Sequence, residues 1–199
     1  MLKYLGIRGV AQFGSVLEWG SRGREFDSRH SDQRQILTDL PFFFQWGKPR
    51  MDIVIRKAED KDSSAINKLF IEMLFSVYGT TDGTGYEERY LDRYFHDTGD
   101  MILIAEDGDL PVGFLSVQIH NEPSRYIYLD DFSVTESYRG MGIGTAMMDT
   151  AEAYADEKGI PVILLHVEKS NRRAAALYGR RGYRQFRDDG DRALLVKEI

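Results

Sequence analysis

The sequence predicts an α+β domain built in layers, in which helices cover a central sheet. Three observations predict this fold class. Residues 65–77 carry apolar side chains at helical spacing, residues 101–119 have the pattern of a strand hairpin, and residues 162–167 are apolar on both faces of a short strand. A strand that is apolar on both faces is typical of a sheet with a layer on each side.

The first elements can be placed in order along the chain. A β-branched run at residues 53–56 predicts the first strand. The amphipathic helix over residues 65–77 follows it, and Asp62 or Ser63 is placed to cap its N-terminus. A second, weaker helical pattern covers Tyr86 to Phe95.

The later elements follow from turn residues and apolar spacing. Strands from Met101 to Glu106 and from Val112 to Ile119 flank a turn at residues 107–109, which favours a hairpin. Another strand is expected from Tyr126, then a helix that ends near Gly159, then the strand at residues 162–167, a further helix and terminal strands. The helix that ends near Gly159 has an inward stripe consisting of Ile143, Ala146, Met147, Thr150, Ala151 and Tyr154.

Charge is unevenly distributed. Residues 1–50 hold 8 Lys and Arg against 5 Asp and Glu, whereas the remaining residues hold 18 against 27, so the two parts carry +3 and −9. A nucleic-acid backbone requires a basic face, so we expect no nucleic-acid partner for the acidic part. A negative body is compatible with a cationic substrate, and an acidic surface that aids solubility is the simpler alternative.

The composition also limits location and redox chemistry. The absence of cysteine removes disulfides, thiolate nucleophiles and Cys-ligated metals. The apolar stretches are far shorter than the roughly 20 residues of a membrane span, and charged residues interrupt the first twenty positions. We therefore expect a soluble cytoplasmic protein without a membrane partner.

Residues 1–50 show neither helical nor strand periodicity and are expected to be a non-core extension, with residues 51–199 as the domain and Met51 as a natural start. Arg24 to Arg29 can be encoded by a DNA string that matches the T-arm of a tRNA gene. Translation through an upstream tRNA gene would make the extension spurious. A disordered or partner-binding arm is the alternative, and the sequence leaves both open.

The strand that starts at Tyr126 changes its apolar phase in the middle. Ile127 and Leu129 occupy one phase, whereas Phe132 and Val134 occupy the other. A β-bulge produces such a slip, because it inserts one extra residue into a strand. The sequence therefore predicts a bulge at residues 130–131, and a strand that is apolar on both faces is the alternative.

This strand leads into a glycine-rich turn that opens the next helix. Its spacing is Arg-x-x-Gly-x-Gly, from Arg139 to Gly144, and it lacks both the G-x-G-x-x-G dinucleotide fingerprint and the Gly-Lys-Ser/Thr of a P-loop. Glycines are costly at a helix start, but they let backbone N–H groups approach an anion closely. The turn is thus a candidate pyrophosphate site.

The Arg-x-x-Gly-x-Gly turn resembles the pyrophosphate loop of the GNAT superfamily of acyl-CoA N-acyltransferases, and the resemblance covers the chain from about Ile53 to its end. The run from Asp131 to Gly144 matches closely. A second block resembles the last helix of the family, at Asn171, Ala174, Ala175, Leu177, Tyr178, Gly182 and Tyr183.

The resemblance implies a GNAT-like fold, with a mixed, mostly antiparallel twisted sheet, helices on both faces and a splayed pair of fourth and fifth strands. It implies an enzyme that transfers an acetyl group from acetyl-CoA directly to an amine, such as an aminoglycoside, a polyamine, or a protein or peptide amine. Many members of the family dimerise, so the resemblance is compatible with a homodimer, and the sequence leaves the oligomeric state open. A non-catalytic acyl-CoA-binding sensor or partner domain is the alternative.

The resemblance further implies where acetyl-CoA binds. Main-chain groups along the splayed strand and the glycine-rich turn would hold the cosubstrate, and no metal is implied. The expected cofactor-binding residues are Phe132, Ser133, Val134, Arg139, Gly140, Met141, Gly142, Ile143, Gly144, Thr145, Asn171 and Tyr178.

Attack on a thioester requires a neutral amine, and an alkylammonium with a pKa near 10.4 is neutral in only about one molecule in several thousand at pH 7. A proton acceptor is therefore required. The resemblance implies a carboxylate at the bulge, Asp130 or Asp131, as this general base, and Tyr178 as the acid that protonates the departing sulfur. Because adjacent strand residues point in opposite directions, only one of the two aspartates is expected to face the site.

Other polar residues are weaker candidates. Four acidic residues on the acceptor side could hold a cationic amine, namely Glu72, Glu87, Glu88 and Asp92. His166 interrupts an apolar strand beside the expected cleft and is a candidate for contact with substrate or with a water chain. His96, His120 and His166 do not have the spacing of metal ligands.

Overall fold

The computed structural model describes residues 52–79, 84–96 and 98–199, so the predicted extension over residues 1–50 lies outside the described residues. The strands are β1 (Ile53–Lys57), β2 (Met101–Asp107), β3 (Leu110–His120), β4 (Tyr126–Val134), β5 (Val162–Glu168), β6 (Arg184–Asp189) and β7 (Arg192–Glu198). The α-helices are α1 (Ser63–Tyr78), α2 (Asp92–Phe95), α3 (Ile143–Glu157) and α4 (Arg172–Arg180), with 3₁₀ turns η2 (Asp60–Asp62) and η3 (Glu136–Tyr138).

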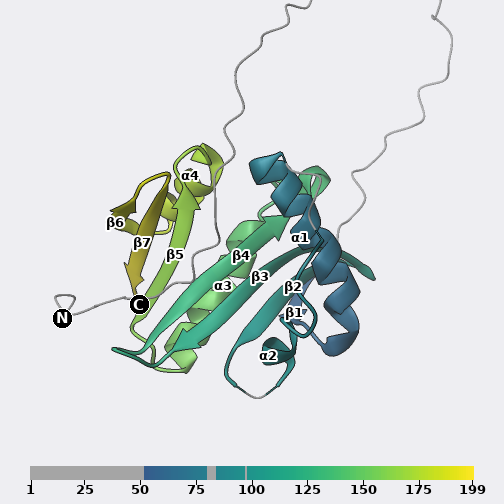
Figure 1. Cartoon of the computed structure of the whole chain (residues 1–199), viewed down its shortest axis with the longest axis horizontal. Helices are drawn as coiled ribbons and strands as arrows, with labels where there is room; N and C mark the ends of the chain where they lie inside the picture. The colour runs from purple at the N-terminus through teal and green to yellow at the C-terminus, as the bar shows by residue number, and fades with distance from the viewer. Residues whose placement is uncertain (1–51, 80–83, 97) are drawn as a thin grey trace, which may run out of the picture. The chain divides into compact units, whose positions relative to one another are not determined.

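The strands form one seven-stranded sheet in the order β1-β2-β3-β4-β5-β7-β6. All neighbouring pairs are antiparallel except β4 and β5, which are parallel. Helices α1 and α2 lie on one face and α3 on the other (Figure 1). The predicted layered α+β fold, the hairpin of β2 and β3, and the mixed sheet are all confirmed.

The domain has two hydrophobic cores, one on each face of the sheet, and the side chains of β2 point alternately into one and the other. Leu103 and Ala105 pack in the larger core with α3, whereas Ile102 and Ile104 pack in the smaller core under α1 and α2. All four are at most 3% exposed, because a helical layer covers each face. Among the residues that the structure describes, no helix has both the length and the apolar character that crossing a membrane requires.

Two local predictions were wrong. The helix expected from Tyr86 to Phe95 is only the four-residue α2, because Arg89 adopts a left-handed φ of 68° that interrupts helical hydrogen bonding. Asp62 occupies the N-cap position of α1, but its carboxylate does not cap the helix. It accepts hydrogen bonds from Arg56 and from the Glu59 amide instead, and Ser63 Oγ donates to the Asp60 carbonyl.

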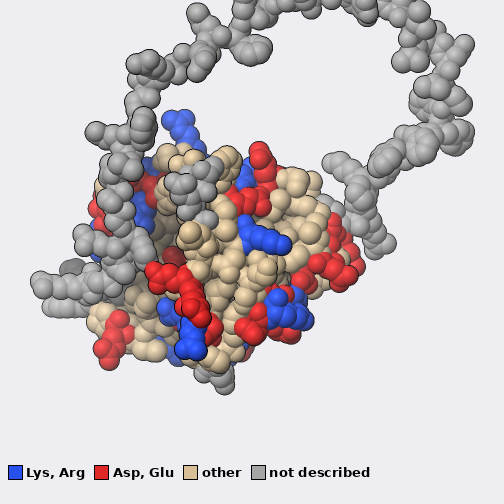
Figure 2. Space-filling view, turned by 45° about the vertical axis from the view of Figure 1, so that its right-hand side comes forward, with Lys and Arg blue, Asp and Glu red and all other residues tan. Residues whose placement is uncertain are grey.

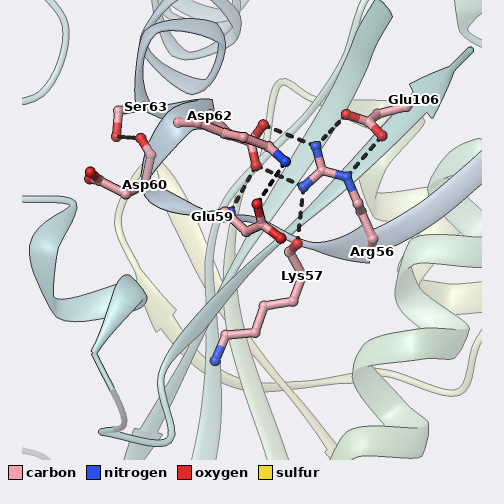
Figure 3. Close-up of polar contacts among 8 residues, drawn as sticks. Arg56, Lys57, Glu59, Asp60, Asp62, Ser63 and Glu106 are labelled. Atoms are coloured by element: carbon pink, nitrogen blue, oxygen red, sulfur yellow. Dashed lines mark hydrogen bonds and ion pairs between the residues drawn. The ribbon is translucent and has the colours of Figure 1, made fainter. Parts of the chain in front are cut away.

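Arg56 fastens the start of α1 to the sheet (Figure 3). Its Nη1 and Nη2 lie 2.7 and 2.9 Å from the two carboxylate oxygens of Asp62, and its Nε lies 2.9 Å from Glu106 Oε2. Asp62 is 7% exposed, and the Arg56 guanidinium lowers the pKa of this carboxyl. Breaking the cluster would leave partly buried carboxylates without their counter-charge, which is costly.

We expect Arg56→Met to lower the free energy of unfolding by about 2 kcal/mol at pH 7, measured by urea denaturation. The loss should shrink as the pH falls below 3.8, because a carboxyl with a lowered pKa stabilises the fold only while it is ionised. Lys61→Met is the matched control, since the Lys61–Glu59 pair is well exposed and screened by water, so the denaturation midpoint should hardly change. An unchanged denaturation midpoint in Arg56→Met would refute this role.

Candidate functional site

A cleft opens where β4 and β5 stop pairing. The parallel ladder joins only Ile127 to Ile163, Tyr128 to Leu164 and Leu129 to Leu165, after which the two strands diverge (Figure 1). The cleft has a volume of about 850 Å³. The predicted splay of the fourth and fifth strands is therefore confirmed, and it leaves a space that is lined by both strands.

The cleft collects nearly all of the residues that the sequence singled out. These are Asp130, Asp131, Phe132, Ser133, Val134, Arg139, Gly140, Gly142, Ile143, Gly144, Thr145, His166, Asn171 and Tyr178. Among the residues expected to bind acetyl-CoA or to act as base or acid, Met141 is the exception, because it is 51% exposed and does not line the cleft. The predicted site is one continuous surface that runs from β4 across the glycine-rich turn to α4.

The glycine-rich turn has the backbone that its sequence suggested. Gly140 and Gly142 adopt φ values of 83° and 86°, which strain any residue with a Cβ. No side chain caps the N-terminus of α3, where Gly142 is the N-cap residue. A Cβ on Gly142 would meet no protein atom within 4 Å apart from its chain neighbours, so the space beside this glycine is open. Such a helix end can bind an anion.

Two arginines border this turn. Arg139 is the first residue of the turn, and its guanidinium donates hydrogen bonds to the Val134 carbonyl at 2.7 Å and to Ser76 Oγ at 3.2 Å. It therefore connects the end of β4 to α1. A Cβ on Gly140 would lie 3.7 Å from Nη2 of Arg173, which places a second guanidinium over the turn. The sequence reasoning missed Arg173, although it follows the motif residue Asn171 by only two positions.

The last helix brings two predicted residues to the cleft. Asn171 Oδ1 accepts a hydrogen bond of 3.1 Å from the Ala174 amide and thereby caps the N-terminus of α4. Tyr178 is 6% exposed, and burial raises the pKa of its hydroxyl above the usual value of 10. This hydroxyl therefore keeps its proton at neutral pH.

The predicted bulge is present in β4. Leu115 of β3 faces Phe132 and Val117 faces Leu129, so Asp130 and Asp131 together stand opposite the single residue Ser116. The expectation that only one aspartate faces the site was wrong, because both line the cleft. A bulge places two consecutive residues where a regular strand has one, and it thereby interrupts the alternation of side chains.

The two aspartates influence each other. Partial removal of water and the negative charge of Asp130 raise the pKa of Asp131 to about 7, against a smaller opposing effect of a hydrogen bond from Tyr86. The pKa of Asp130 is also raised, although this residue reaches solvent in the cleft, because the cleft walls displace water around it. Two such neighbouring carboxyls resist simultaneous ionisation, which suits one of them to accept a proton near pH 7.

Each aspartate has its own hydrogen-bond donor, and the sequence reasoning missed both donors. Tyr86 Oη donates to Asp131 Oδ2 at 2.6 Å. Gln118 Nε2 donates to Asp130 Oδ2 at 3.1 Å and to Tyr94 Oη at 2.7 Å. Tyr86 was hidden inside a predicted helix, and Gln118 is a buried polar residue whose partner lies on the adjacent strand.

A second series of hydrogen-bonded side chains extends from the cleft to β6. Tyr128 Oη lies 2.8 Å from His166 Nδ1, and His166 Nε2 lies 2.8 Å from Asp189 Oδ2. Tyr128 and His166 both line the cleft. If the Asp189 carboxylate accepts the Nε2 proton, Nδ1 is the acceptor for the Tyr128 hydroxyl. Tyr128 lies two residues before Asp130 on the same strand, which is the sequence feature that could have indicated it.

Charges of both signs line the cleft, and the two aspartates lie apart from the arginines at the glycine-rich turn. Arg139 and Arg173 lie at the glycine-rich turn, whereas Asp130, Asp131 and Glu168 lie on the diverging strands. Arg192 also lines the cleft, at 3.9 Å from Glu168. On the face that Figure 2 shows, by contrast, Lys and Arg side chains are interspersed with Asp and Glu.

The four acidic residues predicted to hold a cationic amine lie elsewhere. None of Glu72, Glu87, Glu88 and Asp92 lines the cleft. Glu72 instead accepts hydrogen bonds from Thr135 Oγ1 and the Glu136 amide, which tie α1 to the end of β4. Over residues 52–79, 84–96 and 98–199, no cluster of three or more His, Asp or Glu residues could hold a metal ion.

Comparison with known proteins places this geometry in a family. Residues 67–183 match the Acetyltransferase (GNAT) family. An uncharacterized N-acetyltransferase of Bacillus subtilis, YhfO, is 30% identical over 66% of this chain and 89% of its own length. The D-amino-acid N-acetyltransferase HPA3 of Saccharomyces cerevisiae is 29% identical over 66% of this chain and 85% of its own length.

Solved structures show the same fold. The PaiA N-acetyltransferase of Thermoplasma acidophilum, determined in complex with coenzyme A, superposes with a TM-score of 0.61. The match covers 75% of this chain and all of that chain, at 20% sequence identity.

Proposed function

Since the chain belongs to the acetyltransferase (GNAT) family and is an acetyl-CoA-dependent acyltransferase, we propose that it transfers the acetyl group directly to the amine of a small cationic acceptor. The observation that carries this proposal is the cleft with an anion-binding turn at one part and a carboxylate pair at the other. The first part suits the pyrophosphate of acetyl-CoA, and the second suits an ammonium group.

The residues present fit acetyl-CoA. The uncapped start of α3 and the open space at Gly142 can accept a pyrophosphate, and Arg173 adds positive charge beside it. The diverging edge of β4, from Phe132 to Val134, offers main-chain groups to the pantetheine arm. Asn171 also lines the cleft, and its oxygen caps α4, so its side-chain nitrogen can donate to this arm.

Asp131 is the residue that we assign to accept the proton of the acceptor ammonium. A base works best when its pKa lies near the working pH, and the pKa of Asp131 is raised to about 7. Asp130 contributes the neighbouring charge that raises it and attracts the cation. A bulge also leaves backbone of the extra residue without a ladder partner, and such an N–H is suited to stabilise a developing oxyanion.

Tyr178 is the residue that we assign to the departing sulfur. Burial raises the pKa of its hydroxyl, whereas an ordinary thiol has a pKa near 8.5, so complete proton transfer from Tyr178 to a thiolate is uphill. A hydrogen bond from the hydroxyl to the sulfur still stabilises the charge that develops there. Tyr178 therefore serves as a positioned donor to the leaving group.

The acceptor class is tested by a screen that measures both free CoA and the acetylated product. Polyamines and aminoglycosides should be acetylated faster than neutral amines of the same size, since Asp130 and Asp131 attract cations. Amino acids belong in the screen because the yeast relative is named for D-amino acids and because Arg192 could pair with a carboxylate. Acetylation of neutral amines alone would contradict a cationic acceptor.

We predict that Gly142→Asp weakens acetyl-CoA binding well over tenfold in calorimetric titration, because a carboxylate would occupy the place of the pyrophosphate. Gly142→Asn is the matched control, since it has the same size and tolerates a positive φ but carries no charge. It should weaken binding less. Met141→Ala should be silent because Met141 points out of the cleft. Wild-type affinity in a folded Gly142→Asp variant would remove the turn from the site.

We predict that Tyr178→Phe lowers turnover roughly 10- to 1000-fold and leaves the affinity for acetyl-CoA nearly unchanged. The ring and its packing against Tyr183 remain, so the melting temperature should change little. Steady-state kinetics and calorimetry on one preparation separate the two effects. Full turnover by Tyr178→Phe would reduce Tyr178 to a core residue.

A further inference from the structure

The ring and the backbone of Tyr86, whose hydroxyl contacts the bulge in β4, are both fixed by neighbouring residues. Its ring stacks between Phe70 of α1, at a centroid distance of 4.0 Å, and Tyr90, at 4.8 Å. Its amide donates a hydrogen bond of 2.9 Å to Asn67 Oδ1, also on α1. Stacking and the backbone bond together restrict both the ring and the main chain. The hydroxyl position is therefore determined by α1.

Gly85 permits this close approach. It adopts a φ of 79°, and a Cβ at this position would lie 2.9 Å from Asn67 Oδ1. Both the conformation and the contact favour glycine over any other residue. The chain thus has a specific means of bringing residue 86 against the helix.

The fixed hydroxyl binds only one of the two oxygens of Asp131. Tyr86 Oη donates to Oδ2 at 2.6 Å, a length typical of a strong bond to a carboxylate. Within the described part of the chain, no other side chain hydrogen-bonds Asp131. The second oxygen, Oδ1, is left for a ligand in the cleft.

The hydrogen bond from Tyr86 matters because the other groups around Asp131 do not stabilise its ionised carboxylate. The titratable groups that face Asp131 are Asp130 and Tyr128 on β4, Tyr86 and Tyr90 on the segment before α2, and Tyr78 on α1. The tyrosines are neutral at pH 7, and Asp130 has the same sign as Asp131. Only the Tyr86 bond favours the ionised carboxylate among these contacts.

We propose that Tyr86 is a positioning residue for acetyl transfer, which holds the Asp131 carboxylate with one oxygen bound and the other directed at the acceptor amine. This inference rests on the proposed function. Tyr86 makes no contact with the reacting groups itself, and it acts through Asp131. It also connects the residues before α2 to the proposed base.

The test compares Tyr86→Phe with Tyr90→Phe, which removes from the same stack a hydroxyl that hydrogen-bonds Tyr94 and makes no direct hydrogen bond to Asp131. The first readout is the titration of aspartate side-chain carbons by ¹³C NMR, with Asp131→Asn to assign the signal. In Tyr86→Phe the midpoint of Asp131 should rise by about one pH unit, because a bond that favours the charged form is lost. In Tyr90→Phe it should stay in place.

The second readout is the pH profile of kcat/KM with an acceptor from the screen. In Tyr86→Phe the ascending limb should move to higher pH by the same amount, so that activity falls about tenfold on the acid side and largely recovers above the new midpoint. A merely structural defect would lower the profile at every pH. Acetyl-CoA affinity and the melting temperature should match those of Tyr90→Phe.

The outcomes separate this inference from the proposed function. If Tyr86→Phe moves neither the NMR midpoint nor the kinetic limb, Tyr86 is a packing residue and the inference is overturned. If the kinetic limb survives in Asp131→Asn but disappears in His166→Gln, the base is His166 and the inference is likewise overturned. If the NMR midpoint moves but the wild-type protein acetylates no amine, the Tyr86–Asp131 coupling stands and the proposed function fails.

Discussion

Between Leu129 and Phe132, strand β4 carries two residues where β3 offers only Ser116 as a partner. This one-residue mismatch places Asp130 and Asp131 on the same cleft, and their proximity shifts the pKa of Asp131 to about 7. The pairing of β4 with β5 ends at Leu129, directly before the mismatch. The opening for a ligand and the carboxylates that face it therefore come from the same short stretch of backbone.

Helix α1 connects this stretch to both parts of the cleft. Arg56 fixes its start to β1 and β2, and Asn67 holds the Tyr86 backbone near its middle. Farther along, Glu72 binds the residues that follow β4, and Ser76 accepts from Arg139 at the glycine-rich turn. Helix α1 is thus connected to Asp131 by way of Tyr86, and to the glycine-rich turn by way of Arg139. A displacement of α1 would disturb both binding regions together.

Structural features that depend on a short contiguous segment could be predicted from the sequence. Contacts between residues that are far apart in the sequence could not. The phase slip between Leu129 and Phe132 predicted the bulge, and the glycine spacing predicted the turn at the start of α3. The rule that adjacent strand residues point to opposite faces failed at Asp130 and Asp131. The bulge interrupts this alternation, so both side chains line the cleft. Tyr86 was assigned to a helix because a left-handed φ at Arg89 leaves no mark in apolar spacing. Gln118, Tyr94 and Asp189 reach their partners only through strand pairing and packing.

Deletion of Asp130 would give β4 one residue opposite Ser116 and restore a regular ladder with β3. The most direct measurement supplies ¹³C-acetyl-CoA and a polyamine to the wild-type protein and to this deletion variant, and follows the labelled amide by mass spectrometry. We expect the wild type to label the amine and the deletion variant, although it unfolds cooperatively, to label none. Equal labelling by a folded variant without the bulge would contradict the claim that the bulge builds the acetyl-transfer site.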